Sequence, residues 1–256
     1  MSKKLLRLFL IIFILFPLLF TLIWAFTENW EYGKLFPQAF SIRAWKSLFL
    51  NKNNIKIILN SLYISFIASI ISIIISYPAA KAIALYDFKG KSLFRLIVFL
   101  PIVIPVTSVA IGLHLNLLRL GLANTKAGVV LVHAFPAIPY AFMILEPIFS
   151  SIGENYENQA ILLGASGLKK FLYVNLPMML PGLRSSFFMS FVVSFSQYFL
   201  TFLIGGGLVK TYSTIVFPVI SNKDRHEASV FSIVFILILL LVGFITFRLG
   251  NRKEDD

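Results

Sequence analysis

The sequence contains no cysteine and few charged residues. Of its 256 residues none is cysteine, only 13% are charged, and 58% are hydrophobic. A soluble domain carries about 25% charged residues, so this composition is typical of a membrane protein. Without cysteine the chain can form neither a disulfide nor a zinc-thiolate site, and it has no thiol nucleophile.

Patterns for catalysis and nucleotide binding are also missing. The phosphate-binding pattern G-x-x-x-x-G-K-[ST] does not occur, so the chain is not expected to cradle ATP itself. We find no paired carboxylates, metal cluster or Ser/His/Asp arrangement, and we therefore assign no catalytic and no metal-binding residue. His114 and His133 stand alone in apolar segments. Hydrogen bonding within a helix bundle is favoured for them over a proton relay or a metal ligand.

Long apolar runs are what the chain has in abundance. Residues 230–247 hold fifteen Val, Ile, Leu and Phe residues and no charge. At about −0.4 kcal/mol each, their insertion into a bilayer is favoured by roughly 6 kcal/mol. About 20 helical residues cross a ~30 Å hydrocarbon core. The sequence thus predicts an all-α membrane protein, a single transmembrane domain over residues 1–256 with six transmembrane helices at about 5–26, 57–80, 96–118, 129–149, 183–204 and 230–247.

Basic residues indicate the orientation. The net charge is +12, which we assign to residues that flank spans and contact anionic headgroups rather than to nucleic-acid binding. An even number of spans places both termini on one side, together with 13 of the 23 Lys and Arg residues and the dense short flanks at residues 3–7 and 89–95. The positive-inside rule then predicts cytoplasmic termini. The N-terminus resembles a signal peptide, but its long apolar part without an A-x-A-like site favours an uncleaved first span.

Polar side chains form stripes on two predicted spans. Each stripe follows one helical face, through Ser61, Ser65, Ser69, Ser72 and Ser76 in the second span and Ser186, Ser190, Ser194, Gln197 and Thr201 in the fifth. Small hydroxyl residues let helices pack closely, and packing is favoured for the second span. Gln197 and Tyr198 are too large for that and bring hydrogen-bonding groups to membrane depth. The fifth span therefore favours a pathway for a polar solute, with Ser194, Ser196, Gln197 and Tyr198 as its candidate residues.

A polar segment, ENQAILLGASGLKKFLYVNLPMMLPG, lies at residues 157–182 between two apolar runs. A short helix from Glu157 is expected to stop at Gly164, because glycine suits a helix C-terminus. Ser166 can cap a second helix over 167–175, which Pro177 is expected to end. Such a helical hairpin with an apolar stripe suits a groove on a partner protein. The alternative is an amphipathic hairpin resting on the membrane surface.

The spacing in this segment resembles the EAA motif of permease subunits of bacterial ATP-binding-cassette importers: Glu-Ala-Ala, three residues, Gly, then about nine residues before a hydrophobic-x-Leu-Pro. The residues that match are Ala160, Gly164, Ala165, Ser166, Leu176 and Pro177. FPQAFSIRAWKSLF, LPIVIP and FPAIPYAF resemble the family more loosely, so the likeness covers most of residues 35–205.

The chain departs from the motif at its first two positions. Where the family has Glu-Ala-Ala, this sequence has Asn158-Gln159-Ala160, and Glu157 lies about 100° away around the helix. The packing part of a partner contact is expected through Ala160 and Gly164. Whether Glu157 supplies the missing carboxylate is left open.

The resemblance implies a MetI-like importer permease fold with a cytoplasmic coupling hairpin, residues 157–177, between the fourth and fifth spans. It implies a bacterial plasma (inner) membrane location, a second permease subunit that is a copy or a sister chain, an extracytoplasmic solute-binding protein, and cytoplasmic ATPase subunits that use ATP and Mg, with no cofactor on this chain. The coupling residues would be Glu157, Asn158, Gln159, Ala160, Gly164, Ala165, Ser166, Leu176 and Pro177.

Cargo is inferred only from the same resemblance. The size and the FPQAFSIRAW loop are most similar to the branch that serves polyamines, thiamine and ferric iron, so a small polar solute of that kind is expected. The alternative function is an ion-gradient-driven secondary transporter. Such a carrier would need intramembrane acidic residues, and no predicted span has one at its centre.

Overall fold

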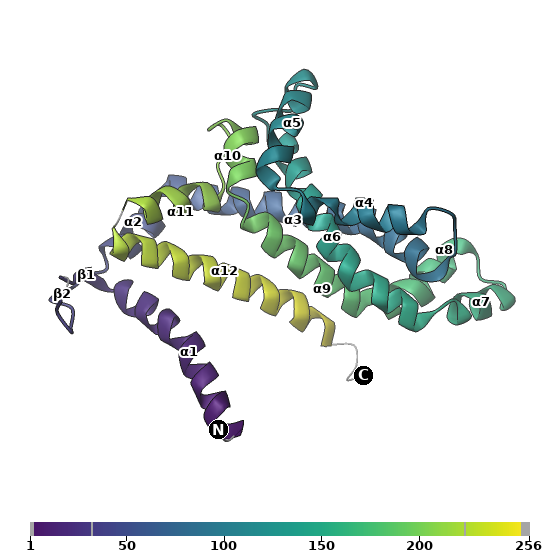
Figure 1. The fold of residues 1–256 in the computed structure, drawn as a ribbon, viewed down its shortest axis with the longest axis horizontal. Coiled ribbons are helices and arrows are strands. Elements are labelled where there is room, and N and C mark those ends of the chain that lie inside the picture. Colours follow the sequence, from purple (N-terminus) through teal and green to yellow (C-terminus); the bar gives the residue numbers. More distant parts are fainter. Residues whose placement is uncertain (1–2, 32, 223, 252–256) are drawn as a thin grey trace. The chain divides into compact units, whose positions relative to one another are not determined.

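The computed structural model describes residues 3–31, 33–222 and 224–251, and most of them are helical (Figure 1). In chain order the elements are α1 (Lys3–Trp24), β1 (Thr27–Asn29), β2 (Ala39–Phe40), α2 (Arg43–Leu50), α3 (Lys52–Leu85), α4 (Lys91–Val103), α5 (Val106–Arg119), α6 (Lys126–Ile152), α7 (Asn155–Leu162), α8 (Gly167–Lys170), the π-helical turn η1 (Phe171–Asn175), α9 (Leu176–Phe195), α10 (Phe199–Gly205), α11 (Tyr212–Ser221) and α12 (Arg225–Asn251). Among the described residues 5 helices are long and apolar enough to cross a membrane, or up to 6 with the bent pair α4 and α5. The predicted all-α membrane fold is confirmed.

The chain forms two compact units. Unit 1 contains α1, the β1–β2 pair, α2, residues 52–59 of α3, α11 and residues 225–241 of α12. Unit 2 contains residues 60–85 of α3, the elements from α4 to α10 and residues 242–251 of α12. The polar hairpin and the candidate pathway residues belong to unit 2, so this unit carries the sites of interest.

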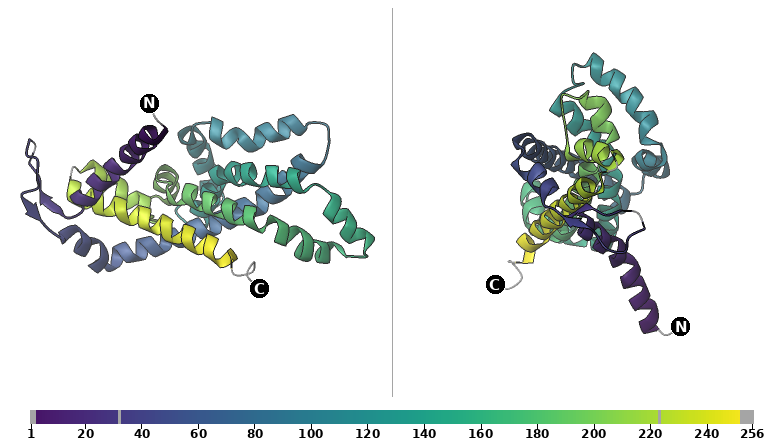
Figure 2. Two further views of the ribbon diagram at one scale, coloured as in Figure 1. Left: turned by 90° about the horizontal axis from the view of Figure 1, so that it is seen from below. Right: turned by 90° about the vertical axis from the view of Figure 1, so that its left-hand side faces the viewer.

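Helices α6 and α9 lie side by side in unit 2, as the separate views confirm (Figures 1 and 2). They approach closely at Gly182 of α9, where an added Cβ would collide with the side chain of Ile148 on α6. Phe142 and Leu145 of α6 and Met179 of α9 are almost fully buried beside this contact. Because α6 precedes the hairpin in the chain and α9 follows it, this packing fixes both ends of the hairpin.

Helix α3 is longer than a bilayer requires. Its 34 residues rise about 51 Å at 1.5 Å each, against a hydrocarbon core of about 30 Å. The helix therefore continues beyond the hydrocarbon, and its C-terminal turns, which carry Lys81, can reach polar elements outside the membrane.

Two of the predicted spans differ from the observed helices. Residues 96–118 do not form one straight span: α4 and α5 meet at an angle of 99°. Pro105 explains the break, because it excludes Ile104 from helical conformation, and Ile104 is extended with ψ 128°. The predicted span 183–204 begins earlier and is interrupted, since the helical run extends over Gly167–Phe195 and α10 follows only at Phe199.

Unit 1 is organised around aromatic and polar contacts. Strands β1 and β2 pair antiparallel, with Thr27 opposite Phe40. The short helix α2 buries Ala44 and Leu48, one turn apart, on a single face. Trp45 of α2 donates from Nε1 to the carbonyl of Ala25 at 2.8 Å, which fixes α2 beside the end of α1.

Candidate functional site

The polar hairpin is built around a glycine turn. Helix α7 ends in a Schellman motif: the amide of Gly164 donates to the carbonyl of Ile161 at 2.9 Å, and the amide of Ala165 donates to that of Ala160 at 2.9 Å. Gly164 has φ +80°, a left-handed conformation that a residue with a Cβ adopts only at a cost. The predicted helix stop at Gly164 is confirmed.

The second half of the hairpin begins where the sequence predicts. The Ser166 hydroxyl caps α8 by accepting a hydrogen bond from the amide of Lys169 at 3.4 Å. The prediction that Pro177 ends this helix is wrong, because the chain continues through η1 into α9 without interruption. The π-turn explains this continuity: the amide of Leu176 bonds to the carbonyl of Phe171, one residue further back than in an α-helix. That wider turn makes room for the ring of Pro177 at the start of α9.

The hairpin presents an apolar surface with polar flanks. Leu162 and Leu163 at the turn are 86% and 88% exposed, and Leu168 and Tyr173 on the second arm are 69% and 77% exposed. Among the predicted coupling residues, Asn158, Gln159, Gly164, Ser166 and Pro177 are exposed, Glu157, Ala165 and Leu176 are half-buried, and Ala160 is buried. Large exposed apolar side chains on a protruding element mark a contact surface, either for a protein groove or for a membrane.

Glu157 points into the base of the hairpin. Its carboxylate accepts hydrogen bonds from Lys81 Nζ of α3 at 2.5 Å and from Asn175 Nδ2 of η1 at 2.9 Å, and it pairs with Lys170 Nζ of α8 at 3.0 Å. Burial alone would raise the pKa of this carboxyl, but the hydrogen bonds from Lys81 and Lys170 outweigh burial and hold the pKa below its ordinary value. The carboxylate is therefore charged and engaged within the chain.

The candidate pathway residues mark a break in the helix. Between α9 and α10 the segment Ser196–Tyr198 is not helical. Ser196 is exposed and Gln197 and Tyr198 are half-buried, whereas Ser194 is buried in the last turn of α9. Non-helical backbone at membrane depth is tolerated only where protein covers it or where it lines a water-filled cavity.

His133 contacts residues on both sides of this break. Its ring, 1% exposed on α6, lies 3.0 Å from Ser194 Oγ through Nδ1 and 2.8 Å from Thr201 Oγ1 through Nε2. Thr201 donates to the carbonyl of Gln197 at 3.0 Å, and Ser194 Oγ lies 3.2 Å from Ser65 Oγ of α3. One histidine thus links α9, α10 and, through Ser194, α3, which confirms the predicted hydrogen-bonded role within the bundle.

The serine stripe of α3 is a packing surface. Its five serines are at most 1% exposed. Ser72 donates to the carbonyl of Ala134 at 3.1 Å and Ser76 to that of Ile138 at 2.8 Å. Both carbonyls belong to α6, so the stripe bonds α3 directly to that helix. The packing interpretation of this stripe is confirmed.

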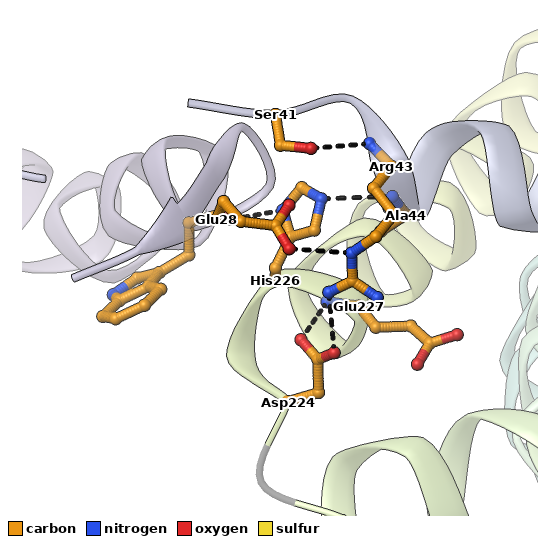
Figure 3. A network of polar contacts seen from close by, with 8 residues as sticks. Glu28, Ser41, Arg43, Ala44, Asp224, His226 and Glu227 are labelled. Carbon is orange, nitrogen blue, oxygen red and sulfur yellow. Dashed lines mark hydrogen bonds and ion pairs between the residues drawn. The ribbon is translucent and has the colours of Figure 1, made fainter. Parts of the chain in front are cut away.

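A second polar cluster lies in unit 1 and has no local sequence signal (Figure 3). Arg43 lies between two carboxylates, with Nε 2.9 Å from Glu28 and Nη2 3.0 Å from Asp224. The buried His226 ring accepts at Nε2 from the amide of Ala44 and donates from Nδ1 to the carbonyl of Trp24. The cluster joins the loop after α1, the start of α2 and the start of α12.

The carboxyls of this cluster make unit 1 sensitive to acid. The Ser41 hydroxyl lowers the pKa of Glu28, burial opposes this effect, and Arg43 lowers the pKa further. Burial opposes ionisation of Asp224, but the Glu227 amide and Arg43 outweigh it, so its pKa is also lowered. Carboxyls with depressed folded-state pKa values stabilise the fold above their unfolded pKa values, and this stabilisation is lost as the pH falls through the folded values.

We therefore expect Arg43→Gln to move the acid transition of unit 1 to higher pH, because both carboxyl pKa values rise toward their ordinary range. The 3 tryptophans, Trp24, Trp30 and Trp45, all lie in unit 1, so tryptophan fluorescence against pH reports on this unit alone. Lys46→Gln, which removes an exposed charge without a described ion pair from the same helix, should leave the midpoint unchanged. Coincident midpoints for Arg43→Gln and the parent chain would contradict the assignment.

Fold and site together define a class: a multi-span helical membrane protein with an exposed polar hairpin. The described residues contain no group of three or more side chains that could hold a metal ion. Residues 72–252 match the family described as "Binding-protein-dependent transport system inner membrane component", and the chain belongs to that family. The resemblance to importer permeases is thereby confirmed.

Known relatives agree with this assignment. A probable sulfate transport system permease protein from Prototheca wickerhamii is 29% identical over 195 residues, covering 70% of this chain and 76% of the relative. A molybdate/tungstate transport system permease protein from Pyrococcus furiosus is 28% identical over 218 residues, covering 85% and 87%. In fold, the chain is similar to a bacterial ABC transporter involved in the import of the acidic polysaccharide alginate, with TM-score 0.77, 16% identity and coverage of 96% and 94%. The relatives do not support the expected polyamine, thiamine and iron branch.

Proposed function

We propose that this chain is the permease subunit of an ATP-driven importer, and that residues 157–177 form the cytoplasmic hairpin that docks into an ATPase subunit. The observation that carries the proposal is the glycine turn at Gly164 with its exposed apolar side chains, such as Leu163 and Leu168. Family membership supports it, since the family is described as binding-protein-dependent. The hairpin joins α6 to α9, so its displacement would tilt both helices and change access to the pathway.

The remaining parts of the machine are proposed from the family to which the chain belongs. It has no phosphate-binding motif, so ATP and Mg are handled by the ATPase subunits. An extracytoplasmic binding protein delivers the solute, and a second permease subunit, a copy or a sister chain, completes the pathway. The complex resides in the bacterial inner membrane with both termini of this chain in the cytoplasm.

The pathway is proposed to run past Ser196, Gln197 and Tyr198. These residues interrupt the helix between α9 and α10, and broken helices at membrane depth are found where transporters bind solutes. Their hydroxyl and amide groups are neutral hydrogen-bond donors, which suit an oxyanion. The named relatives transport sulfate and molybdate or tungstate. We therefore propose an oxyanion as cargo, and sulfate and molybdate are the solutes to use in uptake assays.

An ion-gradient carrier is disfavoured by the placement of acidic groups. Glu146 is the only acidic residue within the predicted spans, and in the structure it pairs with Arg95 of α4. A paired carboxylate is not free to bind and release a coupling ion. The same pairing leaves no unpaired carboxylate in the six predicted spans to attract a cationic cargo such as a polyamine.

The orientation can be tested with single cysteines, because the parent chain has none. Leu163 of the hairpin is 88% exposed and Leu35, in the loop after α1, is 86% exposed. In intact spheroplasts a membrane-impermeant maleimide should label Leu35→Cys, and should label Leu163→Cys only after permeabilisation. The cysteine-free parent chain is the negative control and should not be labelled. Labelling of Leu163→Cys from the outside would overturn the proposed function.

A further inference from the structure

The hairpin is attached to more of the bundle than its two connecting helices. Covalently it continues only into α6 and α9, but Glu157 also pairs with Lys81 on α3. Within the hairpin, Glu157 contacts Lys170 on α8 and Asn175 on η1. Lys81 lies 76 positions before Glu157 in the sequence. This contact is therefore a tertiary link between the hairpin and the C-terminal turns of α3.

The link is shielded from water. The side chains of Lys81, Glu157 and Lys170 retain only 20%, 13% and 22% of their exposure. Aromatic rings pack nearby: the Tyr77 ring of α3 lies edge-on to Phe149 of α6 and to Phe171 of η1, with ring centroids 5.0 Å and 6.0 Å apart. Partly buried ion pairs are screened less than exposed ones, so this contact holds its geometry more firmly than a surface pair.

Most of the acceptor capacity of the carboxylate is used within the chain, since three of its about four acceptor positions are occupied. One oxygen contacts Lys81 and Asn175 and the other contacts Lys170. The neighbouring Asn158 and Gln159, which stand where the importer motif has Glu and Ala, are exposed. Removing the Glu157 charge would leave two lysine ammonium groups facing each other without a counter-charge, which favours separation of the hairpin from α3.

We propose that Glu157 is a positioning residue that clamps the hairpin to the end of α3, so that hairpin displacement moves α3 together with α6 and α9. This inference rests on the proposed function for its consequence in transport, although the clamp itself is a property of the fold. Helix α3 carries the buried serine stripe and contacts the His133 cluster through Ser65. The clamp thus gives the hairpin a second route, besides α9, to the break at Ser196–Tyr198.

The test uses the complete transporter, with its ATPase subunits and binding protein, in proteoliposomes. Glu157→Gln should still co-purify with the ATPase subunit and hydrolyse ATP, but solute moved per ATP should fall roughly five- to tenfold, within the range of coupling between sites. The double variant Lys81→Glu with Glu157→Lys should restore at least half of the ratio. Glu154→Gln removes an exposed carboxylate just before α7 and should leave the ratio unchanged.

A distance measurement separates the clamp from the proposed function. Spin labels on Tyr86→Cys, just after α3, and Leu163→Cys, in the hairpin, are both at exposed positions of the cysteine-free chain. Their distance distribution should broaden with Glu157→Gln and narrow again in the charge-swapped variant. Loss of ATPase co-purification in Glu157→Gln with an unchanged distribution would overturn the clamp and assign Glu157 to the partner contact. A parent chain that shows the narrow distribution but transports without ATP would overturn the proposed function and leave the clamp standing.

Discussion

Replacing Gly164 by valine will weaken the assembly of this permease with its ATPase subunit and lower ATP-driven uptake by roughly tenfold or more. Gly164 closes the turn between α7 and α8 with φ +80°, and a residue with a Cβ in that conformation costs about 1–2 kcal/mol, with β-branched residues the least suited. Since about 1.4 kcal/mol is a factor of ten, the docking-competent turn should be depopulated by roughly tenfold or more. Co-purification of the ATPase subunit and sulfate or molybdate uptake in the presence and absence of ATP measure the effect.

Gly167→Ala is the matched control for this prediction. Gly167 begins α8 three residues later, has no left-handed backbone, and would place a Cβ in open space. Its substitution should therefore leave assembly and uptake at parental levels. Open space also surrounds Gly164, so the difference between the two variants isolates backbone conformation from crowding. Equal behaviour of the two variants would refute the role assigned to the turn.

His133→Leu should destabilise the bundle and disable the pathway while the hairpin still binds its partner. The substitution removes the two hydrogen bonds to Ser194 and Thr201. At about 0.6–1.7 kcal/mol for a hydrogen bond in a membrane bundle, the loss is roughly 1–3 kcal/mol. For a chain of this size about 1 kcal/mol corresponds to a fall in Tm of about 2–4 °C. Thermal unfolding in detergent, uptake and ATPase co-purification provide the measurements.

His114→Leu is the control variant for this prediction. His114 lies on α5, and its Nδ1 is buried without a hydrogen-bond partner among the described residues. Removing an unsatisfied buried polar group costs little and can stabilise, so the Tm of this variant should stay level or rise. If both variants lowered the Tm by the same amount, the effect would belong to histidine removal in general and not to the cluster around the break.

The hairpin was the most predictable part of the site. Its helix stop at Gly164 and its cap at Ser166 depend on local chemistry that neighbouring residues determine, and both are confirmed. The continuous helix past Pro177 was not predictable in the same way, because a π-turn depends on how the whole segment packs. The break at Ser196–Tyr198 contains no glycine or proline. Beside that break, His133 contacts the hydroxyls of Ser194 and Thr201, which lie 61 and 68 positions further along the chain. Contacts at such separations cannot be predicted from local sequence.

Long-range ion pairs could not be predicted either, because they too depend on tertiary packing. Arg43 and Asp224 are 181 positions apart, so no spacing rule brings them together. The sequence does place Glu157 about 100° from the motif position, which indicates a different direction for its carboxylate. The predicted span ends at residue 80, so the sequence does not reveal that the helix continues past this point. The continuation brings Lys81 to that carboxylate. The length of α3 decides the contact.

The π-turn at Phe171–Asn175 has a consequence for register. One extra residue in a turn rotates everything that follows by about 100° relative to an uninterrupted α-helix. The azimuth of α9 is therefore set by this single supernumerary residue, which aims Gly182 at Ile148 and Ser194 at His133. A relative that lacked it would need its small and hydroxyl residues shifted by one place along the chain to present the same face.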